Sequence, residues 1–500
     1  MRLWVASLLM AAGLGSDALA EKTFGLVIGI DDYTYIPKLH GAVNDALDIA
    51  NTLRGLGADV TLLTDGEATR AAVLGSWQDI LNRAKPGDRL VISYAGHGSN
   101  EPEQTAGSER DGRDENFLLA GFAPRGEAAG QRIRDDEIAD LLAQSAGLDV
   151  IFVADACHSG TVTRNLQPAL GYRYVEAETL EADPLPPPPP PARAEGKDSV
   201  VLFLAAVSET EKVPEVMIDG TPRGALSYAF SSGLRGAADF DGNGTVTKGE
   251  LETHVRRTVR QVSDGVQLPQ SEPAGQENRV IASVPKPDPK PTTRKPLKDL
   301  SFSDLPPISV STGLAHLDGT VAGTPATLTL KGAAVFSTVG TPVTFATDRA
   351  TLQAVADKQR MIAALTQMAS NDLDISFSNG DRSYLLGDTL SIRIDRRQSP
   401  YLTLFNLGSD GTISLLYPLH AFGDPVDRIP SDRLDLPVRI SAPFGADHVV
   451  AIETRFPATA LHRELAHLSG SRDMARLWDL VKPTQGKVAV FPFFTTDMES

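Results

Sequence analysis

The sequence has little cysteine and little positive charge. Cys157 is the single cysteine among 500 residues, so no disulfide bond can form within the chain. The formal net charge is −17, which argues against nucleic acid or an anionic membrane surface as a partner. Hydrophobic residues make up 41% of the chain and charged residues 22%, which is ordinary for a globular protein. A chain of this length is too long for one core, so we expect two or three domains.

Long hydrophobic runs are absent except at the N-terminus. Residues 1–20, MRLWVASLLMAAGLGSDALA, have a basic start at Arg2, an apolar core, and Ala18 and Ala20 in an A-x-A pattern. This pattern predicts a secretory signal peptide cleaved after Ala20, and the apolar core is short for the alternative, a membrane anchor. We therefore expect a periplasmic or extracellular bacterial protein without a membrane span. An unpaired cysteine there is either reactive or, as the default interpretation, a small buried side chain.

The first half of the chain alternates short apolar runs with helical patterns. Expected strands cover 24–30, 58–65, 88–96, 148–156 and 198–207, and expected helices cover 42–57, 68–84 and 134–147. The strands are apolar on both faces and alternate with helices, which indicates a mostly parallel sheet covered on each side. The predicted fold class is therefore an α/β sandwich.

Two proline-rich segments interrupt the chain. Segment 183–199 contains six consecutive prolines between two expected strands of one sheet, so we predict an exposed excursion there. Segment 284–307 is rich in Pro and Lys and is predicted to be a linker between domains. Beyond it, β-branched residues, Ser and Gly predict a mainly β domain over 308–500. Its expected elements are a hairpin at 401–418, strands at 446–454 and 486–495, and helices within 348–369 and 458–480.

Two loops of the predicted sheet carry chemistry. His97 in YAGHGSN (94–100) follows one strand, and Cys157 in VADACHSG (153–160) follows another. Functional groups collect at the carboxyl ends of parallel strands, and an imidazole can remove the proton of a thiol to create a nucleophile. Gly98 lets the backbone turn, and the N–H groups of Gly98 and Cys157 are candidate donors to an oxyanion. Either side chain alone favours a structural role, but the pair predicts nucleophilic catalysis.

At these residues the sequence resembles the caspase-like cysteine peptidases, most closely the metacaspase and bacterial caspase-like branch. YAGHG and DACHSG match the two signatures of that branch. The resemblance covers about residues 23–282, including GLVIGIDDY, LHGAVNDA, DGRDENFLLAG and RGALSYAF. It implies a caspase-type α/β fold in a cysteine endopeptidase acting on proteins or peptides, with His97 as general base and Cys157 as nucleophile. The caspase pattern with Gln before Ala-Cys is absent, because Asp155 takes that place.

The resemblance also implies a specificity. In the metacaspase branch, an Asp two residues before the Cys and the Asp of an ND helix form an acidic S1 pocket, and by position these are Asp155 and Asp45. Carboxylates at the bottom of a pocket favour Arg or Lys, so cleavage after basic residues is expected. The alternatives are that Asp45 stabilises the first turn of its own helix and that Asp155 is an acceptor at a strand end. Relatives often have Ser two residues before the His, where Ala95 stands here.

A second, independent motif is DFDGNGTVTKGE (239–250). It fits the twelve-residue calcium loop, with Gly244 at its tight turn. The predicted ligands are Asp239, Asp241, Asn243, Thr245 through its carbonyl, and Glu250. Gly236 interrupts the preceding helix and no second loop is present to pair with this one, so an Asp/Gly turn between helices is the alternative. We expect Ca²⁺ to bind weakly, with a Kd of about 10⁻⁴–10⁻³ M, and we expect no organic cofactor.

Self-cleavage is a further expectation. Caspase-type chains carry a processing segment within the catalytic domain, and residues 161–197 occupy that place. Its basic candidates for cleavage are Arg164, Arg173, Arg193 and Lys197. The acidic run 108–117 is either a further cation site or, more commonly for such runs, a solvated loop.

The C-terminal part offers no nucleophile or metal cluster in its sequence. Residues of about 384–457 resemble a β-rich module found in bacteria after caspase-like and kinase-like domains. This resemblance implies no chemistry, and the expected role is binding or targeting through a protein or envelope partner. The leading hypothesis is a secreted cysteine endopeptidase that cleaves after Arg or Lys. The alternative is a catalytically silent caspase-fold scaffold that binds through the β domain, but a scaffold need not retain the His97 and Cys157 pair. An Asn-specific, legumain-like enzyme fits poorly, because two carboxylates do not favour a neutral side chain.

Overall fold

The structure is a computed structural model. It describes residues 22–102, 113–157, 172–175, 200–206, 213–218, 221–263, 265, 267–284, 297–306, 308–312, 326–331, 334–337, 342–346, 348–370, 373–377, 384–395, 401–418, 433–484 and 486–497. The expected signal peptide (1–20) and the proline-rich excursion (183–199) lie outside these residues. None of the helices within the described ranges is long and apolar enough to cross a membrane.

A six-stranded sheet forms the centre of the N-terminal half, in the order β12-β8-β7-β3-β1-β2. The strands are β1 (Thr23–Gly29), β2 (Asp59–Thr64), β3 (Arg89–Ala95), β7 (Asp149–Asp155), β8 (Val200–Ala205) and β12 (Gln270–Glu272). All neighbours pair in parallel except β12, which runs antiparallel to β8 at one edge. The predicted mostly parallel sheet is confirmed.

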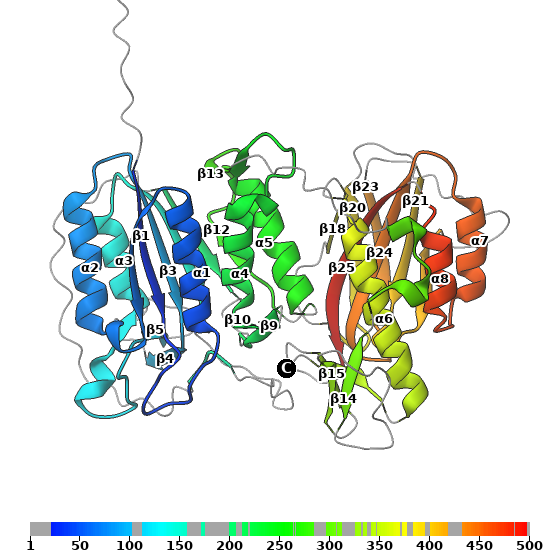
Figure 1. Ribbon diagram of the computed structural model, residues 1–500, viewed down its shortest axis with the longest axis horizontal. Coiled ribbons are helices and arrows are strands. Elements are labelled where there is room, and N and C mark those ends of the chain that lie inside the picture. Colours follow the sequence, from blue (N-terminus) through cyan, green and yellow to red (C-terminus); the bar gives the residue numbers. More distant parts are fainter. Residues whose placement is uncertain are drawn as a thin grey trace, which may run out of the picture.

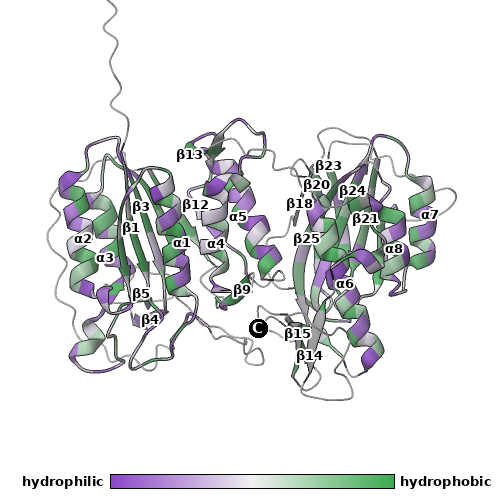
Figure 2. Ribbon diagram, viewed as in Figure 1, coloured by the Kyte–Doolittle hydropathy of each residue, from purple (hydrophilic) through white to green (hydrophobic). Residues whose placement is uncertain are grey.

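Helices cover both faces of this sheet (Figure 1). Helices α2 (Arg70–Arg83) and α3 (Asp135–Gln144) lie on one face, and α1 (Ala42–Gly55), α4 (Ala225–Ser232) and α5 (Lys248–Val262) lie on the other. In α2, for example, Val73, Trp77 and Ile80 recur at helical spacing and are buried against the sheet. Figure 2 shows apolar strands inside and polar residues on the outer sides of the helices, as an α/β sandwich requires.

The carboxyl ends of β3 and β7 lie side by side. The two strands are in parallel register, with Ala95 opposite Asp155. Adjacent strands are separated by about 4.8 Å. His97 and Cys157 each follow two residues after these paired positions, so the fold brings both predicted residues to the same edge of the sheet.

Several short strands extend this core. They are β4 (Gly98–Pro102), β5 (Arg113–Leu118), β6 (Arg132–Arg134), β9 (Val216–Ile218), β10 (Thr221–Arg223), β11 (Thr245–Thr247) and β13 (Val280–Ser283). Strands β4, β5 and β6 form an antiparallel sheet that begins directly after His97. The sequence does not predict these strands, because segments such as GSNEP in β4 lack apolar alternation.

The C-terminal half consists mainly of strands, as predicted. A five-stranded sheet, β19-β25-β24-β21-β22, lies beside the smaller sheets β18-β20-β23 and β14-β15-β16-β17. The strands are β14 (Ser309–Thr312), β15 (Ala326–Lys331), β16 (Ala334–Ser337), β17 (Pro342–Phe345), β18 (Asp374–Phe377), β19 (Tyr384–Leu385), β20 (Thr389–Asp395), β21 (Tyr401–Leu407), β22 (Ile413–Tyr417), β23 (Arg433–Arg439), β24 (Gly445–Thr454) and β25 (Lys487–Thr496). The helices are α6 (Arg349–Met368), α7 (Thr459–Leu468) and α8 (Met474–Val481).

The last residues of the predicted linker pack onto the C-terminal domain. Two short turns, η5 (Leu297–Asp299) and η6 (Phe302–Asp304), lie in this stretch. Phe302 is buried in the same apolar cluster as Trp478 of α8, and the Trp478 Nε1 donates a hydrogen bond to the Leu300 carbonyl at 3.0 Å. Residues that pack onto the C-terminal domain thus begin about ten residues before position 308. They do so because apolar side chains follow the Pro/Lys-rich stretch.

Candidate active site

His97 lies in the loop after β3 and is fully buried. Its Nε2 is 2.8 Å from the carbonyl oxygen of Pro37, which can only accept, so Nε2 carries the proton. Nδ1 is then an unprotonated acceptor, and it has no hydrogen-bond partner among the described residues. The imidazole is therefore held in the tautomer that a general base needs.

Two buried tyrosines hold the backbone of His97. The Tyr33 hydroxyl accepts a hydrogen bond from the His97 N–H at 3.0 Å, and the Tyr94 hydroxyl lies 2.7 Å from the His97 carbonyl oxygen. A Cβ on Gly96 would lie 2.6 Å from the Tyr94 hydroxyl and 2.7 Å from the Tyr33 hydroxyl. The glycine before His97 therefore makes room for this tyrosine pair.

Burial controls the charge of His97. It lowers the pKa of the imidazole to about 4, and the positive charge of Arg173 lowers the pKa further, while the hydrogen bond to Pro37 opposes both effects. His97 is consequently neutral at neutral pH and able to accept a proton.

Cys157 follows β7 and is also fully buried. Its Sγ accepts a hydrogen bond from the Val213 N–H and lies 3.9 Å from the Val213 carbonyl oxygen. Because Nδ1 of His97 has no partner within the described ranges, the thiol and the imidazole are not hydrogen bonded to each other. The two side chains follow neighbouring strands, but in this conformation the thiol is directed toward Val213.

The short segment 172–175 lies across this edge of the sheet in the manner of a bound peptide. Tyr174 forms a parallel bridge with Gly98, and Tyr172 forms an antiparallel bridge with Pro214. The segment is thus flanked on both sides by backbone, as an extended substrate is when it binds between strands.

The carbonyl oxygen of Arg173 accepts two hydrogen bonds at this place. One comes from the N–H of Gly98 at 3.0 Å and the other from the N–H of Cys157 at 3.2 Å. These N–H groups are the two candidate oxyanion donors, and the structure brings them onto one carbonyl oxygen. The nucleophile candidate Cys157 and the residue after His97 therefore both donate to the same peptide group.

The side chain of Arg173 enters a group of three buried carboxylates, which we call the arginine site. Its Nη2 is 2.6 Å from Oδ2 of Asp45 and 3.4 Å from Oε1 of Glu215. Its Nη1 is 3.3 Å from Oδ1 of Asp155 and donates to the Asp155 carbonyl oxygen at 3.1 Å. All four side chains are 0% exposed. The structure brings Asp45 and Asp155 together around a basic side chain and adds Glu215 to them.

Helix α4 fixes two of these carboxylates. The Gly224 N–H donates to Oδ2 of Asp45 at 2.7 Å, and the Ser227 N–H donates to Oδ2 of Asp155 at 2.8 Å. Free N–H groups at a helix N-terminus stabilise anions. Asp45 thus interacts with the start of α4 and with Arg173, whereas the first N–H groups of helix α1, which carries it, donate to the carboxylate of Asp31.

Burial and charge act in opposite directions in the arginine site. Burial lowers the pKa of Arg173, but the carboxylates of Asp155, Asp45 and Glu215 raise it above its ordinary value. Burial raises the pKa of Asp45 well above its ordinary value, and Arg173 opposes this. Three carboxylates around one guanidinium leave an excess of buried negative charge, so the site depends on the cation that it holds.

Comparison with known proteins identifies the N-terminal half. Residues 22–279 match the family model described as a caspase domain. The chain belongs to the caspase family. It is similar to metacaspase-1 of Saccharomyces cerevisiae, with 34% identity over 149 residues that cover 27% of this chain and 33% of that protein. Metacaspase-1 of Mycosarcoma maydis is 32% identical over 155 residues, covering 29% and 37%. The chain thus spans about a third of the length of these curated relatives, and the expected family is confirmed.

The C-terminal half has a match of its own. Residues 383–457 of this caspase-family chain match a domain of unknown function (DUF4384). A solved structure of a Geobacter sulfurreducens protein is 22% identical to this chain, covers 53% of it and 100% of its own length, and has a TM-score of 0.38.

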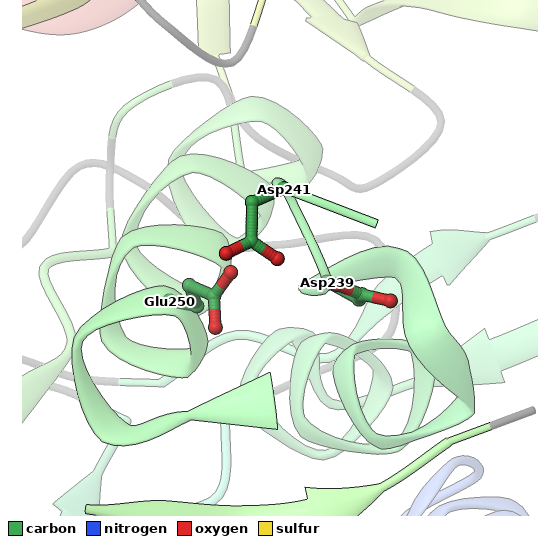
Figure 3. A group of neighbouring side chains, drawn as sticks. All are labelled: Asp239, Asp241 and Glu250. Carbon is green, nitrogen blue, oxygen red and sulfur yellow. The ribbon is translucent and has the colours of Figure 1, made fainter. Parts of the chain in front are cut away.

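The predicted calcium loop of this caspase-family chain lies between η4 (Gly233–Ala237) and α5. One carboxylate oxygen each of Asp239, Asp241 and Glu250 lies within 4.8 Å of the others. Figure 3 shows the two aspartates on the loop and the glutamate on the first turn of α5. The preceding helical segment breaks at Gly236, which has φ 105°. Three of the five predicted ligands are therefore close together.

The carboxylates of loop 239–250 are bound by N–H groups of the loop itself. The Asn243 N–H lies 3.0 Å from an oxygen of Asp239 and 3.0 Å from one of Asp241. Oε2 of Glu250 accepts from the N–H and hydroxyl of Thr247 in a capping box at the start of α5. The Asn243 side-chain oxygen accepts from the Thr245 N–H at 2.7 Å. The donor set fits a hard cation, provided that Glu250 turns from its capping position.

Several parts of the site have no motif in the sequence. Glu215 stands in the stretch ETEKVPEV, which has neither regular spacing nor a glycine-rich loop to mark it. Tyr33 and Tyr94 do lie within the stretches GLVIGIDDY and YAGHG. An aromatic residue inside each of these motifs is therefore a signal in the sequence from which their role near His97 can be predicted. Of the four candidate cleavage positions, Arg173 is described, and the other three (Arg164, Arg193 and Lys197) lie outside the described residues.

Proposed function

We propose that this caspase-family protein is a cysteine endopeptidase that cleaves after basic residues, with Cys157 as nucleophile and His97 as general base. One observation carries the proposal. The Arg173 carbonyl receives hydrogen bonds from Gly98 and Cys157 while its guanidinium contacts three buried carboxylates. That is the arrangement a peptide with Arg at P1 requires in an oxyanion site and an S1 pocket.

The chemistry assigned to each group follows from its geometry. After Cys157 rotates away from Val213, the unpartnered Nδ1 of His97 accepts the thiol proton. The thiolate attacks the carbonyl carbon after the basic residue, and the resulting oxyanion accepts hydrogen bonds from the N–H groups of Gly98 and Cys157. Protonated His97 then gives its proton to the leaving amine, and water hydrolyses the thioester that remains.

Hydrolysis of a peptide with Arg before a fluorogenic group tests this function. Wild-type protein should release the fluorophore, and Cys157→Ala protein should not. The assay is run with and without Ca²⁺, because the activity is proposed to depend on the ion. Absence of wild-type hydrolysis under both conditions would sink the proposal and favour a silent scaffold, which the similarity to metacaspases does not favour.

We also propose that the protein cleaves itself between Arg173 and Tyr174. The support is that the Arg173 carbonyl already accepts from both candidate oxyanion donors. Mass spectrometry of wild-type protein should reveal a new N-terminus at Tyr174, which Cys157→Ala and Arg173→Ala should both lack. A wild-type chain that stays intact with and without Ca²⁺ contradicts self-cleavage.

Calcium activation is supported by the position of loop 239–250. Helix α4 donates N–H groups to Asp45 and Asp155 at its first residues and continues through η4 to the loop. An ion held by Asp239, Asp241 and Glu250, with Asn243 and Thr245 completing the set, would fix the far end of this helical segment. We propose that fixing this end also fixes the start of α4, whose N–H groups hold Asp45 and Asp155 in the arginine site.

Secretion is proposed from residues 1–20, which have the three regions of a signal peptide. Expression in a bacterial host followed by N-terminal sequencing should give Glu21 as the first residue of the exported protein. An exported or cytoplasmic product that still begins with Met1 contradicts the proposal. The C-terminal domain is proposed to bind a protein or envelope partner, in line with its lack of a nucleophile cluster in the sequence.

A further inference from the structure

Glu215 is the member of the arginine site for which neither the caspase signatures nor the calcium loop accounts. It is 0% exposed, and its Oε1 lies 3.4 Å from Nη2 of Arg173. Its two oxygens also accept hydrogen bonds from the N–H groups of His40, at 2.9 Å, and Gly41, at 2.8 Å. The side chain thus connects the strand β9 region to the segment just before α1, which carries Asp45.

The three carboxylates surround the guanidinium from both of its ends. Nη2 contacts Asp45 and Glu215, and Nη1 contacts the side chain and the carbonyl oxygen of Asp155. A guanidinium presents these two nitrogens in a fixed plane, whereas a lysine presents one ammonium nitrogen. A lysine in this place would therefore leave at least one buried carboxylate without a cationic partner, which is costly in a dry site.

The backbone at the start of α4 also lies close to the guanidinium. A Cβ on Gly224 would lie 2.5 Å from Nη1 of Arg173 and 2.1 Å from Oδ2 of Asp155. The backbone of Gly224 thus lies close to Nη1 of Arg173, and its N–H donates to Asp45. A side chain at position 224 would collide with the bound cation and with Asp155.

We propose that Glu215 is a specificity-determining residue that, together with Asp45 and Asp155, makes the site select arginine over lysine at P1. This inference rests on the proposed peptidase function, and it deepens the expectation of Arg or Lys to a preference between them. From the strength of hydrogen bonds to charged groups, we expect a preference of roughly 10- to 100-fold. Loss of the Glu215 charge should reduce it by about tenfold.

The test measures kcat/KM on two peptides that differ only in Arg or Lys at P1. Wild-type protein should prefer the Arg peptide, and Glu215→Gln should lower the Arg-to-Lys ratio by about tenfold. The ratio is the informative readout, because loss of the bonds to His40 and Gly41 alone would slow both substrates equally. The matched control is Asp48→Asn, which removes a carboxylate one turn further along α1 that pairs with Arg223 and Arg235 outside the arginine site. It should leave the ratio unchanged.

The outcomes separate this inference from the proposed function. If wild-type protein hydrolyses neither peptide, the peptidase function fails and the inference fails with it. If wild-type protein hydrolyses the Arg peptide but Glu215→Gln keeps the wild-type ratio, the function stands and the inference is wrong. A wild-type enzyme that cuts both peptides equally also overturns the inference.

A second measurement does not depend on turnover. In the Cys157→Ala background, Arg173→Lys should lower the melting temperature, and it should lower it less when Glu215→Gln is also present. This double-mutant cycle measures the coupling between Arg173 and Glu215 directly, and additive shifts would contradict the proposal. If Glu215→Gln does not fold, Glu215→Asp serves in both experiments, because it keeps the charge and withdraws it from the guanidinium by one methylene.

Discussion

Two clusters of three carboxylates lie at the two ends of the helical segment formed by α4 and η4, and their surroundings differ. In the arginine site, Asp45, Asp155 and Glu215 are fully buried and share one guanidinium. In loop 239–250, the carboxylates of Asp239, Asp241 and Glu250 are exposed or half-buried and accept hydrogen bonds from neighbouring N–H groups. Only the buried cluster requires a counter-charge in order to fold, because water can solvate the exposed one.

The comparison also separates the roles of the two clusters. The arginine site is filled by a residue of the same chain, so its carboxylates already have a cationic partner. Loop 239–250 is held by its own backbone and has a geometry that a small rearrangement would convert to ion binding. We therefore expect removal of the cation to lower the free energy of unfolding strongly in the first case and much less in the second.

Removal of Arg173 should have the largest effect. In a Cys157→Ala background, Arg173→Ala leaves three buried carboxylates without their cation, and we expect the free energy of unfolding at pH 7 to fall by about 3–5 kcal/mol. The loss should be smaller at pH 5, because the pKa of Asp45 is raised by burial and a proton can replace the guanidinium. Urea denaturation at pH 7 and at pH 5 measures this loss in the free energy of unfolding.

A surface arginine provides the control for that experiment. Arg235 is 45% exposed and pairs with Asp48 at 2.8 Å. Arg235→Ala should cost less than about 1 kcal/mol, as exposed ion pairs do. If Arg235→Ala and Arg173→Ala lower the free energy of unfolding equally, burial does not explain why the arginine site depends on its cation.

Acid should destabilise the buried region through His97. Burial lowers its folded-state pKa to about 4, below the ordinary value of about 6.5. A lowered pKa gives stability that is present above pH 6.5 and is lost as pH falls through 4, because the unfolded chain binds the proton first. The expected contribution is about 3 kcal/mol. His254, whose pKa burial also lowers to about 4, adds to the same loss.

Urea denaturation of Cys157→Ala protein between pH 7 and pH 4, with and without His97→Gln, isolates the contribution of His97. The variant should lose less stability over this range than its parent does. If both lose the same amount, the imidazole is not held neutral by burial.

The backbone wall of the arginine site should be as sensitive as its charges. Gly224→Ala would place a Cβ 2.1 Å from Oδ2 of Asp155 and should lower kcat/KM for Arg peptides by about 100-fold or more. Gly75→Ala in α2 is the matched control, since a Cβ there has nothing within 4 Å and should stabilise the helix by about 0.5–1 kcal/mol. Gly224→Ala protein with wild-type activity would show that the substrate does not use this wall.

The two clusters also show why sequence predicts one kind of site better than another. The predicted ligands of loop 239–250 lie in one continuous stretch, so their spacing in the sequence is enough to predict them. The strands that end just before His97 and Cys157 follow from apolar runs, and the five predicted strands of the central sheet agree with the structure to within about two residues at each end, whereas the short edge strand β12 is not predicted. The arginine site is assembled from four residues that lie far apart in the sequence, Asp45, Asp155, Arg173 and Glu215. They come together only because of the order in which the strands pair in the sheet. The sequence therefore predicts neither the role of Glu215 nor the contact of the Cys157 thiol with Val213.

The smallest expected effect concerns Ca²⁺ at loop 239–250. With a Kd of about 10⁻³ M, 10 mM Ca²⁺ should raise the free energy of unfolding of Cys157→Ala protein by about 1.4 kcal/mol. Asp241→Asn should abolish this gain, because it removes one of the three charges that face the ion. Asp79→Asn, which removes an exposed carboxylate from α2, should keep the gain. Equal stabilisation of all three proteins by Ca²⁺ would mean that the ion binds elsewhere, and the exposed cluster would then be a turn between helices that needs no cation.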